Sequence, residues 1–254
     1  MRLFFLQLRA EIRNLYFSPA TYIAAFLFIL LMGLVFQWAV NSFLQSTQEV
    51  PPWVLFFQGA FWVPVCFMVP LLTMRTLAEE KKQGTLESLL ATPITATQLV
   101  TAKFFAAYFF YLSLWALTLL FNAILYRLTP SPSLWEAGPI IGGIIFTSSS
   151  GLLFIAVGIF TSALTRSQLV AGIFSFSLLF TIIFGTWFIA RLPLTDIAYG
   201  QQLVGFVEYI QLFQHAEDFG QGVIDSRPIA LYLSLALVLY VLSIMMVDSK
   251  IWRS

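Results

Sequence analysis

Charged residues, histidine and cysteine are all scarce in this sequence. Only 10% of its 254 residues are Asp, Glu, Lys or Arg, whereas 59% are hydrophobic. Soluble domains contain about 25% charged residues, so this composition indicates an integral membrane protein. The formal net charge is +1, and no basic surplus indicates a nucleic-acid partner.

With a single cysteine and a single histidine, we expect neither an internal disulfide bond nor a metal site. Cys66 lies within a hydrophobic run, has no second cysteine to pair with, and is expected to be a buried structural thiol. His215 has no cysteine or second histidine near it, so we expect no metal site. Residues 138–143 have the glycine spacing of a phosphate-binding loop, but Ile144 stands where that loop requires lysine. No nucleophile and base stand out as a pair, so we expect no catalytic residue on this chain.

Six hydrophobic runs have about the 20 residues that cross a bilayer as a helix. They cover residues 20–40, 53–74, 104–126, 139–164, 169–190 and 229–247. None contains a charged residue, whereas ion-coupled carriers usually need an ionisable group at membrane depth. The expected fold class is therefore an all-α integral membrane protein with six transmembrane helices, forming one domain over residues 1–254.

The basic residues are divided unequally between the two sides of this arrangement. With both termini cytoplasmic, ten of the 13 Lys and Arg residues lie inside and three outside. The inside set is Arg2, Arg9, Arg13, Arg75, Lys81, Lys82, Lys103, Arg166, Lys250 and Arg253, and the outside set is Arg127, Arg191 and Arg227. Because cytoplasmic loops are enriched in basic residues, this bias predicts that the N and C termini are both cytoplasmic.

Residues 1–18 predict an amphipathic elbow helix in the membrane interface. The apolar positions at helical spacing are Phe4, Leu8, Ile12 and Leu15, and the arginines of the other side are Arg2, Arg9 and Arg13. We expect the apolar side to enter the acyl boundary and the arginines to reach the headgroups. A secretory signal is the alternative, but the following run of about 21 residues is too long for the hydrophobic part of such a signal.

The charged segment of residues 75–102 must lie in water, since each charge at the membrane centre would cost a few kcal/mol or more. Gly84 predicts the left-handed end of a first short helix. Thr85 is expected to cap a second short helix. Thr95 and Gln98 have the spacing of a capping box that starts the next helix.

The sequence predicts that the second short helix, over residues 86–91, is amphipathic. Its apolar side would carry Leu86, Leu89 and Leu90, and its polar side Glu87 and Ser88. A stiff amphipathic element of this kind suits the docking of a partner protein. An ordinary loop whose charges are solvated is the alternative interpretation.

This segment also carries a resemblance to a known family. The run EEKKQGTLESLLATPIT, from Glu79 to Thr95, resembles the first cytoplasmic loop of type-2 ABC exporter permeases. It is most similar to the gliding-motility type, related to the permeases of nitrous-oxide-reductase maturation. The resemblance implies that this loop is a coupling helix that contacts an ATPase subunit. The residues on the family pattern are Glu79, Glu80, Gly84, Thr85, Glu87, Leu90 and Pro93.

The longest stretch between runs, residues 191–227, predicts a half-buried helix near the outer surface, because Leu203, Phe206, Ile210 and Phe213 recur at helical spacing. Its last part resembles the family's segment before the final span, which implies re-entrant helices that gate the outer mouth. Ala216 stands where the family usually has phenylalanine. The gate residues are then Phe206, Ile210, Phe213, His215, Phe219, Gly222 and Asp225.

Small residues recur along the fourth run. Gly138 and Gly142 are four positions apart, as are Gly143, Thr147 and Gly151. Such spacing lets helices approach closely, so we expect these positions to serve helix packing. The alternative is that the hydroxyl groups of residues 147–150 line a pathway.

The resemblance implies a function. The chain would be a permease subunit of an ATP-driven exporter in the bacterial plasma (inner) membrane, forming half of the translocation pathway and not itself an enzyme. Its partners would be an ABC ATPase subunit in two copies, which binds the ATP and Mg²⁺, and a second permease copy or homologue; some members also act with an extracytoplasmic partner subunit. No cofactor is expected on this chain. The alternatives are a non-transporting membrane scaffold and a secondary carrier, which would show repeated halves and buried charges.

Overall fold

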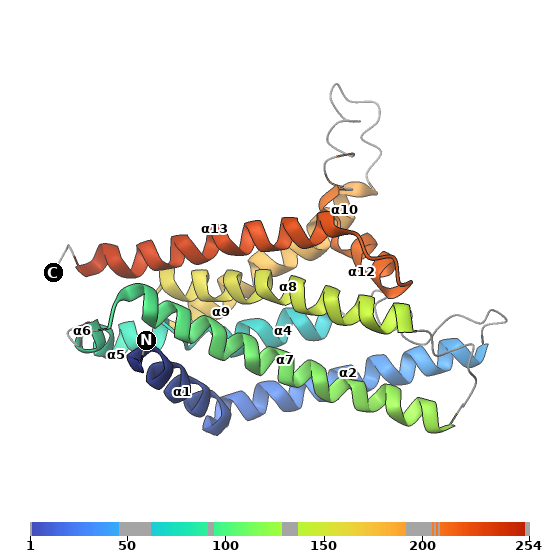
Figure 1. The fold of residues 1–254 in the computed structure, drawn as a ribbon, viewed down its shortest axis with the longest axis horizontal. Coiled ribbons are helices and arrows are strands. Elements are labelled where there is room, and N and C mark those ends of the chain that lie inside the picture. Colours follow the sequence, from blue (N-terminus) through green and yellow to red (C-terminus); the bar gives the residue numbers. More distant parts are fainter. Residues whose placement is uncertain are drawn as a thin grey trace.

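The computed structural model describes residues 2–45, 62–90, 94–128, 137–191, 205, 207 and 209–251. All regular structure in these residues is helical. The helices are α1 (Arg2–Phe17), α2 (Pro19–Gln45), α4 (Trp62–Thr73), α5 (Ala78–Gln83), α6 (Thr85–Leu90), α7 (Ala96–Leu128), α8 (Ala137–Leu164), α9 (Gln168–Phe180), the π-helical turn Thr181–Gly185, α10 (Thr186–Ala190), α12 (Leu212–Gly220) and α13 (Ser226–Ile251). Figure 1 shows their arrangement.

Five helical segments within the described residues are long and apolar enough to cross a membrane, which makes the chain a multi-pass membrane protein. They are Pro19–Trp38, Ala96–Phe121, Ala137–Leu164, Gln168–Ala190 and Ser226–Asp248. Of the predicted run 53–74, the structure describes α4, with 12 residues, and residues 53–61 lie outside the described part. The count of six spans therefore stays a prediction.

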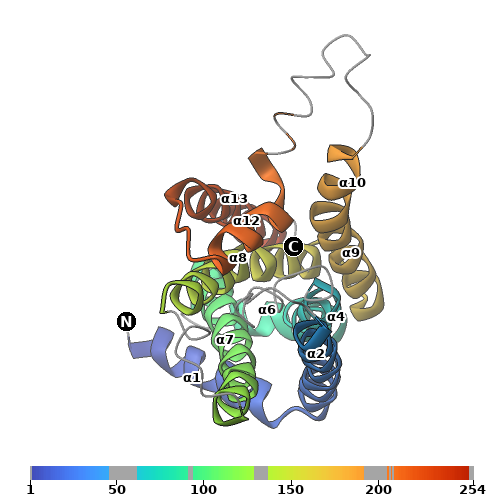
Figure 2. The same cartoon turned by 90° about the vertical axis from the view of Figure 1, so that its right-hand side faces the viewer.

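Helix α8 lies at the centre of the bundle. It packs against α4, α5, α7, α9, α12 and α13, and the end-on view shows it among these helices (Figure 2). Of the α8 span, 67% is buried inside the protein, against 17% of the α13 span. The peripheral helices thus present broad apolar faces outward, while most of α8 contacts protein.

Glycines on α8 permit this close packing. A Cβ atom at Gly142 would collide with the carbonyl oxygen of Phe219 on α12, and one at Gly151 would collide with the Tyr111 ring on α7. Gly158 approaches Thr73 on α4 in the same way. The prediction that small residues serve helix packing is confirmed for Gly142 and Gly151.

The hydroxyl groups of residues 147–150 were the alternative candidates for lining a pathway. Most of them are hydrogen-bonded to carbonyl oxygens of α8 itself. Ser149 and Ser150 are buried, and their hydroxyls donate to the carbonyl oxygens of Ile145 and Phe146 at 2.8 and 2.7 Å. Such bonds to the preceding turn satisfy a hydroxyl without any partner outside the helix. These two serines are therefore part of the packed interior.

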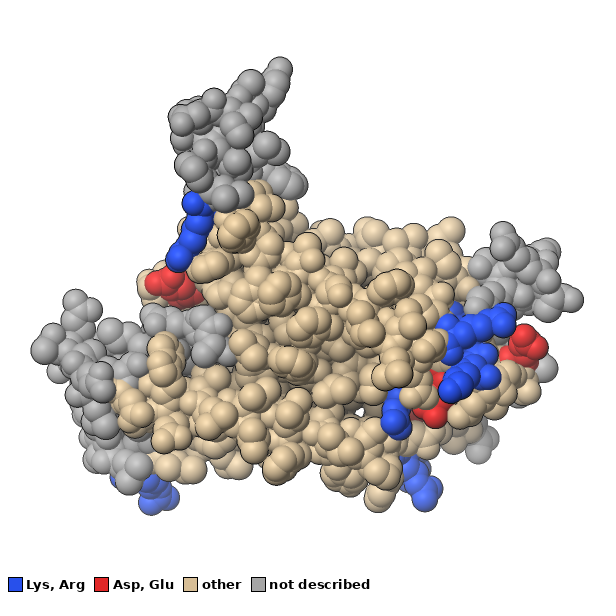
Figure 3. Space-filling view, turned by 180° about the vertical axis from the view of Figure 1, so that it is seen from behind, with Lys and Arg blue, Asp and Glu red and all other residues tan. Residues whose placement is uncertain are grey.

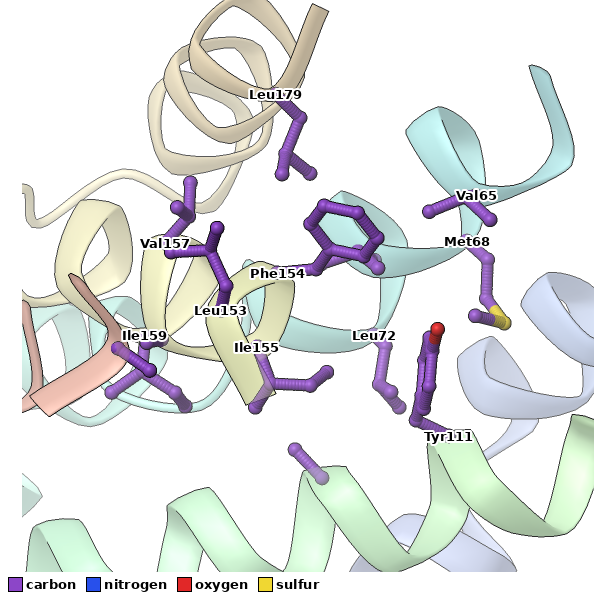
Figure 4. Close-up of a cluster of buried hydrophobic side chains, with 14 of the residues drawn as sticks. Val65, Met68, Leu72, Tyr111, Leu153, Phe154, Ile155, Val157, Ile159 and Leu179 are labelled. Atoms are coloured by element: carbon purple, nitrogen blue, oxygen red, sulfur yellow. The ribbon is translucent and has the colours of Figure 1, made fainter. Parts of the chain in front are cut away.

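The core joins four helices that are far apart in the sequence. Figure 4 shows Leu72 of α4, Tyr111 of α7, Phe154 of α8 and Leu179 of α9 turned toward one another. All four are at most 2% exposed. Because lipid is as apolar as these side chains, close van der Waals packing between the helices, rather than removal from water, holds this part of the bundle together.

Helix α1 differs from the sequence expectation in one respect. Its apolar side, predicted to enter the acyl boundary, packs against α7 instead, with Leu15 against the core and Phe4, Leu8 and Ile12 half-buried. The apolar stripe of α1 is thus covered by α7 of the same chain. Arg9 and Arg13 lie exposed on the other side, as expected.

The two ends of the bundle differ in charge. The start of α1, the end of α13 and the helices α5 and α6 lie at one end, and α12 lies at the other (Figure 1). In the space-filling view, Lys and Arg gather at the α5–α6 end, and a belt without charged residues separates it from the far end (Figure 3). Both chain ends thus lie on the same side of the apolar belt.

The Gly142 contact predicts a large cost for a single methyl group. Gly142→Ala should lower the free energy of unfolding by about 1–3 kcal/mol, because the added Cβ forces α12 away from α8. Gly33→Ala on α2 is the matched control, since a Cβ there meets no atom within 4 Å. Denaturant unfolding in detergent measures both. Equal stability of the two variants would contradict the close approach of α12.

Candidate functional site

The segment made of α5, Gly84 and α6, here called the α5–α6 segment, is the candidate site. A turn over residues 74–77 separates α4 from α5, so the first short helix begins at Ala78 and does not run on from Met74. Gly84 has φ 71°, which confirms the predicted left-handed end of this helix. The chain can therefore reverse direction within one residue and start α6 immediately.

Thr85 does not cap α6 as predicted. It lies inside α6, and its hydroxyl donates to the carbonyl oxygen of Glu80 at 3.4 Å. It thus serves the carbonyl end of α5, because the tight turn at Gly84 brings the hydroxyl back over that helix. The capping box is confirmed, since the amide of Gln98 donates to the Thr95 hydroxyl at 3.2 Å and the amide of Thr95 to the Gln98 side chain at 3.4 Å.

A serine on the central helix caps α5. The amides of Leu77 and Ala78 donate to Oγ of Ser162 at 3.1 and 3.0 Å, and Ser162 is fully buried. No side chain from the residues just before α5 makes this bond. The Lys81 ammonium donates to the carbonyl oxygen of Ala163, at the end of α8. Both ends of α5 are therefore fastened to α8 by buried polar contacts.

A buried ammonium ties the same segment to two further helices. Lys103 Nζ of α7 lies 2.6 Å from a carboxylate oxygen of Glu80 on α5 and 2.9 Å from one of Glu11 on α1. The side chains of Lys103, Glu11 and Glu80 are 4%, 13% and 19% exposed. Gln7 also donates to Glu11 Oε1, at 2.8 Å. This set of three charges, the Lys103 triad, joins α1, the α5–α6 segment and α7.

The Glu80 carboxylate depends on Lys103 for its charge. Burial raises the pKa of Glu80, and the nearby Lys103 ammonium works against that rise. The second oxygen of Glu80 is buried without a hydrogen-bond partner among the described atoms. Without the ammonium, this carboxyl group would have to take up a proton or remain as an unpaired charge.

The surface of the α5–α6 segment that faces outward is polar. Leu86 is 4% exposed and belongs to the core, and Leu89 packs against that core. Leu86 and Leu89 therefore face the chain's own interior. The exposed residues are Lys82, Gln83, Gly84, Thr85, Glu87 and Ser88, while Glu79 is half-buried. The side chain of Leu90 and the predicted site residue Pro93 lie outside the described part.

At the other end, α12 brings together several of the predicted gate residues. The Phe213 ring lies 5.2 Å from the ring of Trp62 on α4 and 5.9 Å from that of Trp187 on α10. Phe219 lies 5.8 Å from Phe146 on α8. Aromatic contacts thus pack α12 against α4, α8 and α10.

The helix predicted across Leu203–Phe213 is not continuous. Gln211 is extended, with ψ 107°, and separates Ile210 from α12. Ile210 is half-buried, and Phe206 lies outside the described residues. The chain therefore changes direction at Gln211, so helical spacing across this point does not place Ile210 and Phe213 on one face.

The remaining gate residues fix the turn into α13. Gly222 has φ 86°, a left-handed conformation that suits glycine. A carboxylate oxygen of Asp225 accepts the Arg227 amide at 3.0 Å, as an N-cap of α13 does. Gly222 and Asp225 therefore fix the backbone of the turn that leads from α12 into α13.

His215 is buried against α13, where its Nδ1 lies 2.8 Å from the Tyr232 hydroxyl. Burial lowers the pKa of His215, and Asp218 and Asp225 oppose that shift. In the described residues, no three His, Cys, Asp or Glu side chains come together as a metal-ligand set. The neutral imidazole therefore acts here as a hydrogen-bonding core residue.

Sequence reasoning missed three residues of the candidate site, namely Glu11, Lys103 and Ser162. Glu11 carries a signal, because it lies three residues after Leu8 and four before Leu15, within the apolar stripe of α1. Lys103, at the start of the third apolar run, has the length to reach that acid. Ser162 gave no signal, since only tertiary packing brings it under α5.

The Lys103 triad predicts a strong effect of removing the ammonium. Lys103→Met should lower the free energy of unfolding by about 3–5 kcal/mol, because two buried carboxylates lose their partner. The deficit should shrink as the pH falls and the Glu80 carboxyl group, whose pKa is raised by burial, takes up a proton; adding Glu11→Gln and Glu80→Gln should restore much of the lost stability. Lys82→Met, which removes an exposed ammonium, is the control and should change stability by under about 0.5 kcal/mol. Similar losses in both variants would contradict the triad.

The lowered pKa of His215 predicts a pH dependence. Because the folded state favours the neutral imidazole, its contribution is present above the ordinary pKa of about 6.5 and is lost as the pH falls below it. Wild type should therefore lose more thermal stability between pH 7.5 and 5 than His215→Gln does. Gln214→His, which adds an exposed imidazole, should follow wild type. Parallel pH profiles for wild type and His215→Gln would refute the burial argument.

Comparison with known proteins agrees with this arrangement of apolar helices. The family model described as ABC-2 family transporter protein matches residues 45–247, well over half of the chain. No curated protein matches the chain. The narrower likeness to gliding-motility or nitrous-oxide-reductase-maturation permeases stays a prediction. The chain belongs to the ABC-2 family of transporter proteins and is a membrane-spanning permease component of an ABC transporter.

Proposed function

We propose that this chain is the permease subunit of an ATP-driven exporter, that it forms half of the translocation pathway, and that the α5–α6 segment couples it to a separate ATPase subunit. Membership of the ABC-2 family implies an ABC ATPase partner. The α5–α6 segment is the candidate for that contact because its exposed face is short, polar and backed by the core.

One observation carries this proposal. The α5–α6 segment is fastened by buried polar contacts to α1 and α7 through the Lys103 triad and to α8 through Ser162 and Ala163. A partner that pushes on its exposed face would therefore move three helices together. A scaffold that only recruits a protein would not need its docking element fixed to the most buried helix of the bundle.

The proposal extends to the assembly. ATP and Mg²⁺ would be bound by two copies of the ATPase subunit, and a second permease copy or homologue would complete the pathway. The apolar faces of α2, α9 and α13, of whose spans 28%, 22% and 17% are buried, leave room for such a partner as well as for lipid. The α5–α6 end would face the cytoplasm of a bacterial inner membrane, in keeping with its basic residues. α12 would then close the outer mouth.

Reversal of one exposed charge tests the coupling. Glu87→Lys should weaken binding of the ATPase subunit and the stimulation of its ATP hydrolysis by tenfold or more, because truncating or reversing a docked charge costs roughly 2–5 kcal/mol. Since Glu87 is exposed, the fold should remain intact, with an unchanged melting temperature.

Asp248→Lys provides the matched control. It makes the same charge change at an exposed position of the same end, on α13 and outside the α5–α6 segment. Co-purification of the ATPase and ATP hydrolysis in reconstituted vesicles are measured for both variants. If both behave as wild type, Glu87 is not at the contact. If the wild-type chain binds the ATPase but does not change its rate of ATP hydrolysis, the chain recruits a partner without coupling to it.

A further inference from the structure

Helices α1 and α2 lie at the periphery of the bundle (Figure 2). A cavity lies where they meet, lined by residues of both helices. It has a volume of about 1190 Å³ and is open to the surroundings. Its lining includes Arg9, Arg13, Asn14, Tyr16, Phe17 and Tyr22. The neighbouring α1 residue Leu6 completes its apolar part. Two guanidinium groups and several aromatic rings thus line one cavity.

Within the part of the chain that the structure describes, the two arginines of this cavity have no acidic partner. Arg9 and Arg13 are four residues apart, so they lie one above the other on the same face of α1. Glu11, two residues from each, points to the opposite face, where it pairs with Lys103. Among the described residues, no carboxylate forms an ion pair with Arg9 or Arg13. The Lys103 triad therefore leaves two positive charges unbalanced in the cavity.

The apolar lining places the cavity at the membrane interface. Leu6, Phe17 and Tyr22 are 57%, 73% and 60% exposed, a large apolar area to leave in water. Aromatic residues of this kind concentrate at headgroup level. Phe17 closes α1, and the first span begins at Pro19, so the hollow lies where a helix in the interface turns into the bilayer. The Tyr16 ring is held in place by Phe110 of α7, at 4.9 Å.

We propose that this cavity binds the phosphate of an anionic phospholipid. Arg9 and Arg13 supply planar, positively charged guanidinium groups, whose geometry matches that of phosphate oxygens. The Asn14 amide and the tyrosine hydroxyls add hydrogen-bond capacity next to them. Phe17, Leu6 and Tyr22 contact the first part of the acyl chains. Free phosphate would use the arginines alone and leave this apolar surface in water.

The proposal is tested on the full-length chain in detergent, without the ATPase, so that its outcome does not depend on the coupling role of the α5–α6 segment. The delipidated protein is titrated with dioleoylphosphatidylglycerol, and bound lipid is counted by native mass spectrometry. Dioleoylphosphatidylcholine and inorganic phosphate are titrated in parallel. Wild type should retain phosphatidylglycerol in preference to phosphatidylcholine and should not be saturated by inorganic phosphate.

Paired substitutions identify the site. Arg9→Gln with Arg13→Gln should weaken phosphatidylglycerol binding by roughly tenfold or more, since two charge-assisted contacts are lost. Lys82→Gln with Arg166→Gln removes the same charge from exposed positions at the same end and should bind as wild type does. Arg9→Lys with Arg13→Lys, which keeps the charge, should retain most of the preference for the anionic lipid over phosphatidylcholine and shows that the helix tolerates substitution.

Three results would overturn the proposal. Equal phosphatidylglycerol binding by the two glutamine double variants would show that the lipid does not use this cavity. Saturation by inorganic phosphate at similar concentrations would show a soluble anion site. A change in the oligomeric mass of the arginine-to-glutamine variant, with lipid binding unchanged, would show that another copy of the chain covers this surface.

Discussion

A lysine ammonium buried between two carboxylates is the constraint on which the α5–α6 end of this protein depends. Lys103 is 4% exposed at its side chain and contacts Glu11 and Glu80, which come from segments 92 and 23 residues away in the chain. Such a charge is tolerated only when its partners are held at contact distance. The geometry of α1, α5 and α7 is therefore fixed jointly, because none of them can move away without leaving a buried charge unpaired.

Helix α8 extends this constraint along the molecule. At one end Ser162 and Ala163 hold α5, and at the other Gly142 lies directly under α12. Between these points α8 packs against α4, α7, α9 and α13. A tightly packed interior transmits displacement poorly by deformation and well by rigid movement. The same helix thus contacts both the segment proposed to meet the ATPase and the segment proposed to close the far mouth.

Patterns within short segments were predictable from the sequence. The apolar runs, the left-handed Gly84 and the Thr95–Gln98 capping box depend on neighbours a few residues away, and the structure confirms them in the described residues. Contacts between distant segments were not predictable. The orientation of Leu86 toward the core and the break at Gln211 depend on what other helices offer at that point. The pairing of Glu11 with Lys103 was likewise not predictable, although the position of Glu11 within an apolar stripe is unusual for an acidic residue.

The central claim is that the Lys103 triad holds the α5–α6 segment rigid with respect to α1. Spin labels at Ser88 on α6 and Asn14 on α1, both exposed, measure this directly by pulsed electron resonance in a Cys66→Ser background. The account predicts one narrow distance distribution in the otherwise unaltered protein and in Lys82→Met, and a broad distribution when Lys103 is replaced by methionine. A distribution that stays equally narrow after Lys103→Met would contradict it.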